Sequence, residues 1–412
     1  MALYAFDGTW NENEQLEDTT NVVRFAEIYK KQSTAVEYVE GVGTRFGVLG
    51  QVLGGLFGSG GRSRVHEMYD ELKENWRKGD HTIDIIGFSR GAALAVHFSN
   101  ILAHHGVKLD DGTMVRPEIR FLGVWDIVGS FGIPINAVIN FQEINLNWNI
   151  DEIPATVKNF YHAMAFNERR EAFNVTRPVA QSELTHFEEL WFKGVHSDIG
   201  GGNNNPLRSN IALQWLLEKA IDSGLAINLE EVERIKIQTN PLARIRNNLD
   251  IQRDAQRIVK STDKFHSSAV AKELVDVGSS FDFIVYAEDF YSWSGVLLKK
   301  HQTYQFDIAD DQFWLDDSIK CNASGWTSDE LPWYKEAVVK YFEGNRRLPE
   351  ANWFELCGSL DDNEDYFRIG KGGENNQYIT ARDAELYAFA NDLLAKYGNN
   401  KGRLNVTIKR VA

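Results

Sequence analysis

The sequence predicts two folded parts, an α/β sandwich around a mainly parallel sheet followed by an all-β sandwich. Through the first 295 residues, short apolar runs alternate with amphipathic helical segments, which is typical of a parallel sheet covered by helices. After that point, short alternating segments follow one another with turn residues between them, the pattern of an all-β domain. A chain of 412 residues is also long enough for two domains. We therefore expect an α/β domain over 1–295 and a β-sandwich over 297–412.

The spacing of apolar residues places the individual elements. Strands of the first part are expected as compact apolar runs at 2–6, 36–39, 83–88, 118–125, 157–167 and 189–195. Helices are expected where apolar residues recur every three or four positions, at 22–28, 63–78, 91–102 and 210–223. Strands of the second part are expected at 301–308, 352–358, 366–369, 384–390 and 403–410.

Charge and composition exclude several classes of function. The net charge is −15, and lysine and arginine are not clustered, which argues against a nucleic-acid partner and against electrostatic docking to anionic membranes. No apolar run reaches the length of a transmembrane helix, and the N-terminus lacks the basic region of a signal peptide. We therefore expect a protein made in the cytoplasm, whose export would need a signal-independent route. Two cysteines, Cys321 and Cys357, do not indicate a disulfide framework.

Ser89 is the candidate nucleophile. It is the centre of a Gly-x-Ser-x-Gly segment between Gly87 and Gly91, preceded by a strand-like run and followed by an alanine-rich helix. This is the strand–turn–helix context of the nucleophile elbow in α/β hydrolases, where glycines let the serine sit in a tight turn. The following helix directs its N-terminus and the Arg90 backbone N–H toward a forming oxyanion. The alternative is a structural turn with a buried serine.

A base and an acid complete such a site. In α/β hydrolases they follow the serine in the order acid, then histidine. His196 lies in a glycine-rich loop just after an expected strand, with His162 as the alternative base. Asp126 ends an expected strand with apolar neighbours, which suits a carboxylate that orients an imidazole. Asp198 is the alternative acid, but it lies two residues after His196 and is expected to fix the loop instead.

A second oxyanion donor is expected from the loop after the first strand. The Gly8 or Thr9 amide fits this position beside the nucleophile. The alternative interpretation of this segment is an Asx-type turn with no catalytic part.

Seven motifs in one order make residues 1–290 resemble the α/β-hydrolase family that includes the type VI secretion phospholipase effectors. These motifs lie at 6–11, 18–22, 41–44, 87–92, 123–130, 162–170 and 191–202. The resemblance implies a Ser-Asp-His triad of Ser89, Asp126 and His196, no cofactor for catalysis, and phospholipid acyl esters as substrates. It also implies secretion-apparatus and immunity proteins as partners. Family members with large membrane-inserting regions are longer than this chain.

The C-terminal part is similar to the end of the PA-I galactophilic lectin fold. The motifs that carry this likeness lie at 357–358, 367–370, 387–392, 397–402 and 404–408. The resemblance implies a calcium ion held by Asp392, Asn399 and Asn400 with the Lys396 carbonyl, oxygen ligands that suit Ca²⁺. The lectin's sugar-contacting His-Pro-x-Gln segment has no evident counterpart between residues 325 and 350. The alternative is that 398–400 is only a turn between strands.

The sequence thus supports three hypotheses for function. The leading one is a serine esterase or lipase that cleaves lipid acyl esters and is expected to act as a secreted antibacterial effector. The second is a calcium-dependent carbohydrate-binding protein with a glycan ligand, which is compatible with the first. The third is a peptidase, or a deacetylase or esterase acting on glycans, because these would use the same triad.

Overall fold

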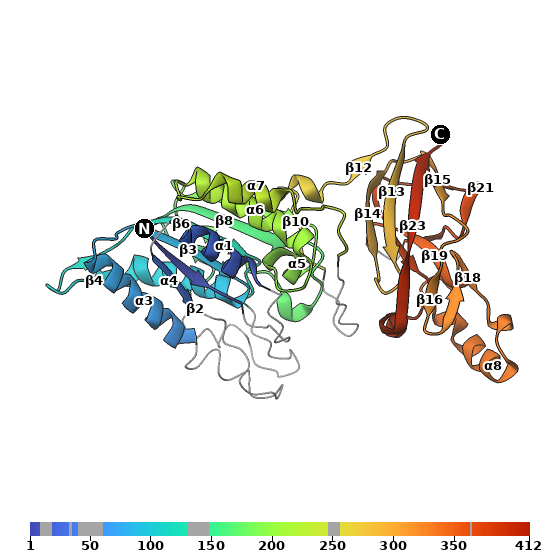
Figure 1. Cartoon of the computed structure of the whole chain (residues 1–412), viewed down its shortest axis with the longest axis horizontal. Helices are drawn as coiled ribbons and strands as arrows, with labels where there is room; N and C mark the ends of the chain where they lie inside the picture. The colour runs from blue at the N-terminus through green and yellow to red at the C-terminus, as the bar shows by residue number, and fades with distance from the viewer. Residues whose placement is uncertain (9–18, 33–34, 40–60, 130–147, 246–255, 363–364) are drawn as a thin grey trace. The chain divides into compact units, whose positions relative to one another are not determined.

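The computed structural model describes residues 1–8, 19–32, 35–39, 61–129, 148–245, 256–362 and 365–412. The chain forms two compact units (Figure 1). The first consists of Met1–Ala243 and Arg253–Ala269, and the second of Arg244–Gln252 and Val270–Ala412. This division confirms the expected order of an α/β part followed by an all-β part.

The first unit is built on a seven-stranded parallel sheet in the order β11-β10-β8-β6-β3-β1-β2. Its strands are β1 (Ala2–Phe6), β2 (Ala35–Val39), β3 (Ile83–Phe88), β6 (Ile119–Trp125), β8 (Val157–Ala165), β10 (His186–Phe192) and β11 (Lys264–Phe265). Two short pairs lie outside this sheet, β4 (Val107–Lys108) with β5 (Met114–Val115) and β7 (Glu152–Ile153) with β9 (Val179–Ala180).

Helices cover both faces of this sheet, α6 and α7 on one side and α3 and α4 on the other (Figure 1). The helices are α1 (Asn21–Lys30), α3 (Gly61–Arg77), α4 (Arg90–His105), α5 (His196–Gly200), α6 (Pro206–Asp222) and α7 (Leu229–Lys236), with the 3-10 turns η2 (Glu171–Phe173) and η3 (Ser267–Ala269). Each face has its own core. In the first core, Phe25 of α1 and Leu216 of α6 pack against Phe121. The core on the other face contains Met68 of α3 and Phe98 of α4.

The carboxyl ends of the parallel strands meet at one edge of the sheet. Register keeps the ends of neighbouring strands level, because Phe88 at the end of β3 lies opposite Trp125 at the end of β6, and Trp125 lies opposite Ala163 near the end of β8. The loops that follow these strands are therefore neighbours. Ligand and catalytic sites of open α/β sheets form at this edge.

The second unit is a sandwich of two six-stranded sheets around one core. The sheet orders are β12-β14-β22-β19-β18, with β20 beside β19, and β17-β16-β23-β15-β21, with β13 beside β23. Its strands are β12 (Lys272–Glu273), β13 (Ser280–Tyr286), β14 (Ser292–Leu298), β15 (Thr303–Asp307), β16 (Trp314–Asp316), β17 (Ile319–Cys321), β18 (Ser324–Trp326), β19 (Trp353–Leu360), β20 (Tyr366–Arg368), β21 (Gly372–Ile379), β22 (Ala384–Ala390) and β23 (Asn400–Arg410). Its helical segments are α8 (Trp333–Phe342), η4 (Ser328–Glu330), η5 (Glu343–Asn345) and η6 (Leu394–Asn399).

The sandwich begins earlier than the sequence analysis placed it. The expected boundary at residue 295 falls inside β14, whereas the structure divides the units at Ala269 and Val270. Strand β13 pairs with β23 from Ser280 to Tyr286, and β14 pairs with β22, so both belong to the second unit. The first of these strands escaped detection because its outward positions are polar or exposed and its buried residues are few.

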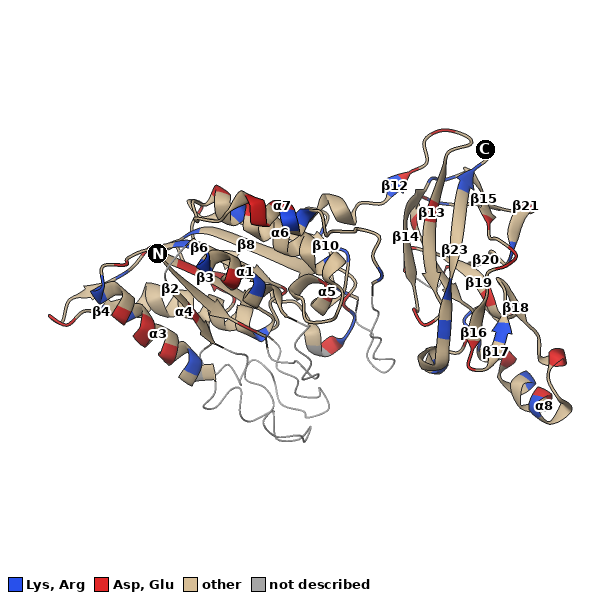
Figure 2. Cartoon of the chain, viewed as in Figure 1, with Lys and Arg blue, Asp and Glu red and all other residues tan. Residues whose placement is uncertain are grey.

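Charged residues of both signs occur on the same helices of the first unit. Figure 2 shows acidic and basic residues mixed along α3 and α7. Among the described residues, no helix is both long enough and apolar enough to span a membrane. Cys321 and Cys357 are buried and unbonded to each other.

The position of the boundary can be tested with fragments. We expect a fragment of residues 270–412 to unfold in one cooperative transition, because it contains both sheets of the sandwich. A fragment of 297–412 lacks β13 and most of β14, so the central strands β22 and β23 each lose one of their partner strands. Near-UV circular dichroism during urea titration measures the unfolding of both fragments. A cooperative transition in the shorter fragment would show that the boundary at 295 is correct.

Candidate active site

Ser89 sits in a strained turn between β3 and α4. Its backbone has φ 59° and ψ −124°, a conformation that a non-glycine residue keeps only when the surrounding structure enforces it. The glycines on either side explain the motif. A Cβ on Gly91 would lie 2.3 Å from the carbonyl oxygen of Phe6, and a Cβ on Gly87 would lie 2.7 Å from the Cα of Ala92. The Gly-x-Ser-x-Gly segment is therefore required by close packing of α4 on the strand ends.

Backbone hydrogen bonds fix this turn to the neighbouring strand. The Ser89 N–H donates to the Trp125 carbonyl at 3.0 Å, and the Val128 N–H donates to the Ser89 carbonyl at 3.2 Å. Arg90 is the first residue of α4, and the first N–H groups of a helix have no partner within it. The Arg90 amide thus belongs to a helix N-terminus directly after the serine, as the sequence analysis expected.

Gly8 lies against the nucleophile turn. A Cβ on this residue would be 3.2 Å from the Ser89 Cβ and 3.0 Å from the Phe88 ring. Its N–H donates to the carboxylate of the preceding residue, Asp7, at 2.7 Å. An oxyanion-donor role for Gly8 would require that N–H to turn from Asp7. Thr9, the other candidate donor, lies outside the described residues.

Asp126 and His196 are in direct contact although 70 residues separate them. The Asp126 Oδ2 lies 2.6 Å from the His196 Nδ1, and both side chains are buried. Asp126 follows β6 with φ 42°, while His196 opens α5 after β10. The Asp126 N–H donates to the Ala163 carbonyl, and its Oδ1 accepts the Ala165 N–H at 2.9 Å. These bonds direct the second carboxylate oxygen toward the imidazole.

Two aromatic rings hold the imidazole of His196. The Phe88 ring stacks on it with a centroid distance of 4.5 Å, and the Phe173 ring meets it edge-on at 4.9 Å. A Cβ on Gly200 would lie 2.0 Å from the Phe88 ring, so glycine at this position of α5 leaves room for the stack. Because Phe88 directly precedes Ser89, the stacking brings the His196 imidazole to the nucleophile turn.

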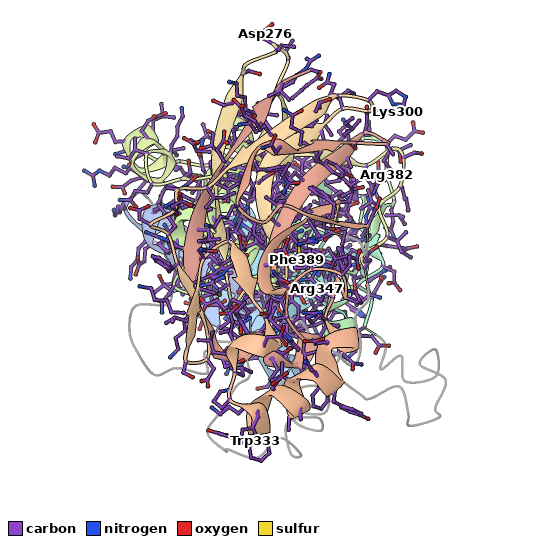
Figure 3. All side chains as sticks on the ribbon, turned by 90° about the vertical axis from the view of Figure 1, so that its right-hand side faces the viewer. Asp276, Lys300, Trp333, Arg347, Arg382 and Phe389 are labelled. Carbon is purple, nitrogen blue, oxygen red and sulfur yellow. The ribbon has the colours of Figure 1, made fainter. Side chains whose placement is uncertain are left out.

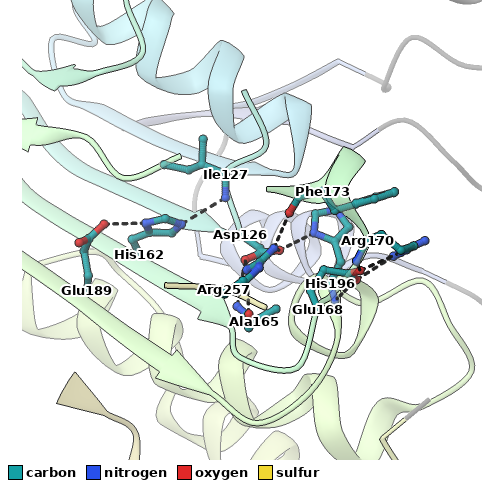
Figure 4. A network of polar contacts seen from close by, with 10 residues as sticks. All are labelled: Asp126, Ile127, His162, Ala165, Glu168, Arg170, Phe173, Glu189, His196 and Arg257. Carbon is teal, nitrogen blue, oxygen red and sulfur yellow. Dashed lines mark hydrogen bonds and ion pairs between the residues drawn. The ribbon is translucent and has the colours of Figure 1, made fainter. Parts of the chain in front are cut away.

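Arg257 completes the site and was not found by sequence reasoning. Its Nη1 and Nη2 donate to the two oxygens of Asp126 at 2.5 and 2.9 Å. The same nitrogens donate to the carbonyls of Ala165 and Phe173, both at 2.7 Å (Figure 4). Only 2% of the side chain is exposed. The residue lies in the stretch 230–295, which had no recognisable pattern, and a lone arginine there carried no signal.

Burial and the neighbouring charged groups together determine the protonation state of Asp126. Burial alone would raise the pKa of its carboxyl, but Arg257 and His196 outweigh burial and hold the pKa well below its usual range. Asp126 is therefore an anion at every pH at which the protein is expected to work.

A second carboxylate, that of Glu168, also faces the histidine. Its Oε2 accepts the His196 backbone N–H at 3.1 Å, and Arg170 holds both carboxylate oxygens at 2.8 Å. Burial raises the pKa of Glu168, and Arg170 and His196 together overcome that effect and lower it. The Arg170 guanidinium in turn lies 3.7 Å from the centroid of the Phe173 ring.

The alternative base, His162, has both ring nitrogens occupied. Its Nδ1 lies 2.9 Å from the Glu189 carboxylate, and its Nε2 accepts the Ile127 N–H at 3.2 Å (Figure 4). The side chain is fully buried. His162 thus supports the loop that follows Asp126 and has no nitrogen left for a serine.

The alternative acid, Asp198, bonds within its own loop, as expected. Its carboxylate accepts hydrogen bonds from the Val195 N–H and from the side chains of Asn203 and Asn205. These bonds fix the glycine-rich segment that carries His196. None of the bonds found for Asp198 among the described residues reaches the imidazole.

In the second unit, the residues implied as calcium ligands share one property. Three of their buried oxygens have no hydrogen-bond partner within the described parts of the chain, namely Asp392 Oδ2, Asn399 Oδ1 and Asn400 Oδ1. An unpaired buried acceptor costs about 1–3 kcal/mol, and a bound cation would pair with all three. Carboxylate and amide oxygens suit Ca²⁺, and the Lys396 carbonyl in the same segment is a further oxygen. The residues present therefore fit the implied calcium ion.

Asp316 adds a carboxylate that the sequence analysis missed. It lies opposite Asn400 in the pairing of β16 with β23, and residues paired in this way face the same side of a sheet. Its Oδ2 accepts the Trp326 indole N–H at 3.1 Å. Burial and the charge of Asp392 raise the pKa of Asp316 to about 7. Asp316 is thus a further carboxylate on the same face of the sheet as Asn400.

The position of Asp392 is fixed by the loop before β19. The Arg347 N–H donates to the Asp392 carbonyl at 3.3 Å, and the Asn391 side chain accepts the Leu348 N–H at 2.9 Å. The Arg347 guanidinium lies 3.6 Å from the centroid of Phe389, and the two side chains are neighbours in Figure 3. This packing orders the segment that carries the unpaired oxygens.

Comparison with known proteins places the first unit in a family. The family model described as "T6SS, Phospholipase effector Tle1-like, catalytic domain" matches residues 3–116 and 109–219. A search of curated proteins gave no match.

Solved structures with similar parts cover only some of the chain. An uncharacterized protein from Pseudomonas aeruginosa is 19% identical over 57% of this chain and 48% of its own, with a TM-score of 0.36. The Tle1 effector bound to the VgrG spike of the type VI secretion system is 24% identical over 50% of this chain and 51% of its own, with a TM-score of 0.34. The chain thus spans about half the length of these two. The EclA N-terminal domain, a PllA-like lectin, is 15% identical over 32% of this chain and 95% of its own, with a TM-score of 0.23.

The contact between Asp126 and Arg257 predicts a loss of stability. We expect Asp126→Asn to destabilise the protein by about 3–5 kcal/mol at pH 7, because a buried guanidinium loses its counter-charge. Urea denaturation measures the change, with Asp110→Asn, which affects an exposed ion pair with Arg77, as the control.

The pH dependence of that loss has a definite sign. Because folding lowers the pKa of Asp126, its contribution to stability is present above the unfolded-state pKa of about 4 and is lost as the pH falls below it. The difference between wild type and Asp126→Asn should therefore shrink in acid. A difference that is constant down to pH 2 contradicts the assignment.

Proposed function

The chain belongs to the Tle1-like phospholipase effector family of the type VI secretion system, whose catalytic-domain model matches residues 3–219, and we propose that it is a serine hydrolase that cleaves phospholipid acyl esters. One observation carries the proposal for this chain's own residues. The 2.6 Å contact between Asp126 and His196 lies beside the strained turn of Ser89, which the Phe88 ring joins to the imidazole.

The proposed mechanism assigns one role to each residue. Ser89 Oγ attacks the ester carbonyl, and His196 Nε2 accepts its proton, since Nδ1 is directed at Asp126. Asp126 orients the imidazole and stabilises its protonated form. The N-terminus of α4, with the Arg90 amide, and an amide at Gly8 or Thr9 stabilise the oxyanion. His196 then protonates the leaving alcohol, and water hydrolyses the acyl-enzyme. No cofactor takes part in these steps.

Family membership supports the substrate class and the mode of delivery. A phospholipid fits a hydrolase of this family, and a spike protein of the secretion apparatus, as in the Tle1–VgrG complex, is the proposed carrier from the producing cytoplasm. A cognate immunity protein is the second proposed partner. A deacetylase or esterase acting on glycans would use the same triad and is the alternative that the substrate assay distinguishes.

Ser89→Ala tests the proposal. We expect kcat for phospholipid hydrolysis to fall about 10³-fold or more, because the triad members act as a unit. Ser99→Ala, which changes a buried serine later in α4 that bonds only to the Val96 carbonyl among the described contacts, is the matched control and should keep most activity. Released fatty acid and lysophospholipid are measured by mass spectrometry.

The outcomes separate the alternatives. Full activity in Ser89→Ala contradicts the triad. Cleavage of short esters alone would keep the chemistry and remove the phospholipid assignment. Release of acetate from acetylated glycans, without lipid cleavage, would favour the deacetylase.

We also propose that the second unit binds a calcium ion and, through it, a glycan. The three unpaired buried oxygens of Asp392, Asn399 and Asn400 favour this second function. Together with the Lys396 carbonyl they would hold the ion, which would supply open coordination positions to sugar hydroxyls. The unit would then concentrate the hydrolase on a glycan-bearing surface.

Calcium addition tests this second function. We expect saturating Ca²⁺ to stabilise the second unit by about 2.7 kcal/mol at a concentration 100 times Kd, measured by calorimetry of the whole chain. Asp392→Asn should abolish the effect. Asn405→Ala, an exposed residue on the same strand β23, should retain it. Stabilisation that Mg²⁺ reproduces equally, or that survives in Asp392→Asn, argues against the site, and a galactose titration then tests the glycan.

A further inference from the structure

We propose that Arg257 is the positioning residue of the catalytic centre, holding the Asp126 carboxylate toward His196 and balancing its charge. The inference rests on the proposed triad. It also extends the catalytic centre beyond the segments 3–116 and 109–219 that match the family model, because Arg257 comes from the stretch before β11.

The geometry of the guanidinium supports a positioning role. Two terminal nitrogens of Arg257 make four hydrogen bonds, two to Asp126 and one each to the carbonyls of Ala165 and Phe173. These acceptors lie after β6, at the end of β8 and at the end of η2. A planar, rigid fork can hold a carboxylate in one orientation, which the single ammonium of lysine cannot do. Arg257 therefore fixes both the acid and the turn that carries the Phe173 ring against His196.

The charges around the imidazole support a second effect of the same residue. His196 faces two carboxylates, Asp126 and Glu168. Each is paired with one arginine, Arg257 and Arg170 respectively. A carboxylate that is already paired stabilises a neighbouring imidazolium less than a lone carboxylate would. Without Arg257, the negative charge of Asp126 beside the imidazole would therefore be left unbalanced.

The fold contains a matched pair that lacks the histidine. Arg120 holds both oxygens of the buried Asp84 carboxylate, at 2.9 and 2.6 Å, with the Tyr29 hydroxyl as a further donor. This pair joins β6 to β3 by a similar bidentate contact, but Asp84 and Arg120 lie earlier in their strands than the carboxyl ends. Breaking it tests what the loss of a buried ion pair does to the enzyme when no catalytic group is involved.

The experiment compares Arg257→Gln, Arg257→Lys and Arg120→Gln in the full chain, with kcat and KM for ester hydrolysis measured across pH. We expect Arg257→Gln to lower kcat roughly 10²-fold through misplacement of the triad. Because the balancing charge is lost, the acid limb of kcat/KM should also move to higher pH, by about one pH unit. Arg257→Lys keeps the charge, so it should lower kcat and leave the acid limb in place. Arg120→Gln should leave the acid limb unchanged.

Four results would overturn the inference or the proposed function on which it rests. Wild-type kcat and pH profile in Arg257→Gln would overturn the inference. So would equal losses of kcat in Arg257→Gln and Arg120→Gln with unchanged profiles, since that is a purely structural effect. If Arg257→Gln does not fold, as judged by circular dichroism, Arg257→Lys decides, and wild-type kcat in that variant overturns the positioning role. Full activity in Ser89→Ala defeats the proposed function itself, independently of any Arg257 result.

Discussion

The buried carboxylate of Asp126 is the constraint around which the edge of the parallel sheet is organised. A charge with no exposed surface must be compensated by hydrogen bonds and counter-charges, and here the compensation comes from several segments at once. The Ala165 amide at the end of β8, His196 after β10, and Arg257 before β11 all bond to its two oxygens. The bonds that compensate the buried charge of Asp126 therefore also bring together residues distant in sequence. The geometry of the proposed triad and the local stability thus depend on one group.

The position of Ser89, the proposed nucleophile, depends on glycines that leave space for neighbouring atoms rather than on side-chain contacts of its own. Gly87 and Gly91 allow α4 to pack against the strand ends, and Gly200 leaves room for the Phe88 ring over the imidazole. Ser89 then needs no side-chain bond to hold its place, because its backbone is fixed by Trp125 and Val128. A methyl group at any of these glycines would collide with backbone or ring atoms. The loop sequences at this edge are thus constrained by sterics as strongly as by chemistry.

Features of the fold that leave a local pattern in the sequence could be predicted from it. Parallel strands, the serine turn and the order of acid and histidine all leave periodic or short-range signals, and the structure brings Asp126 and His196 into contact as expected. Arg257 and Asp316 could not be predicted, because their roles arise only when distant segments meet. The boundary near residue 270 was missed for a related reason. Strand β13 is recognisable as a strand mainly through its long pairing with β23, which the sequence of β13 alone does not reveal.

Two buried aspartates in the same chain show how the surrounding bonds decide the role of a carboxylate. Both oxygens of Asp126 are saturated by protein donors, so it needs nothing further and acts as a fixed negative charge. Asp392 uses one oxygen on the Leu393 N–H, while its other oxygen and those of two neighbouring asparagines have no donor within the described residues. A cation, as proposed for this unit, would satisfy all three at once. The same residue type is thus fully paired in the first unit and keeps an unpaired oxygen in the second, the difference on which the two proposed functions rest.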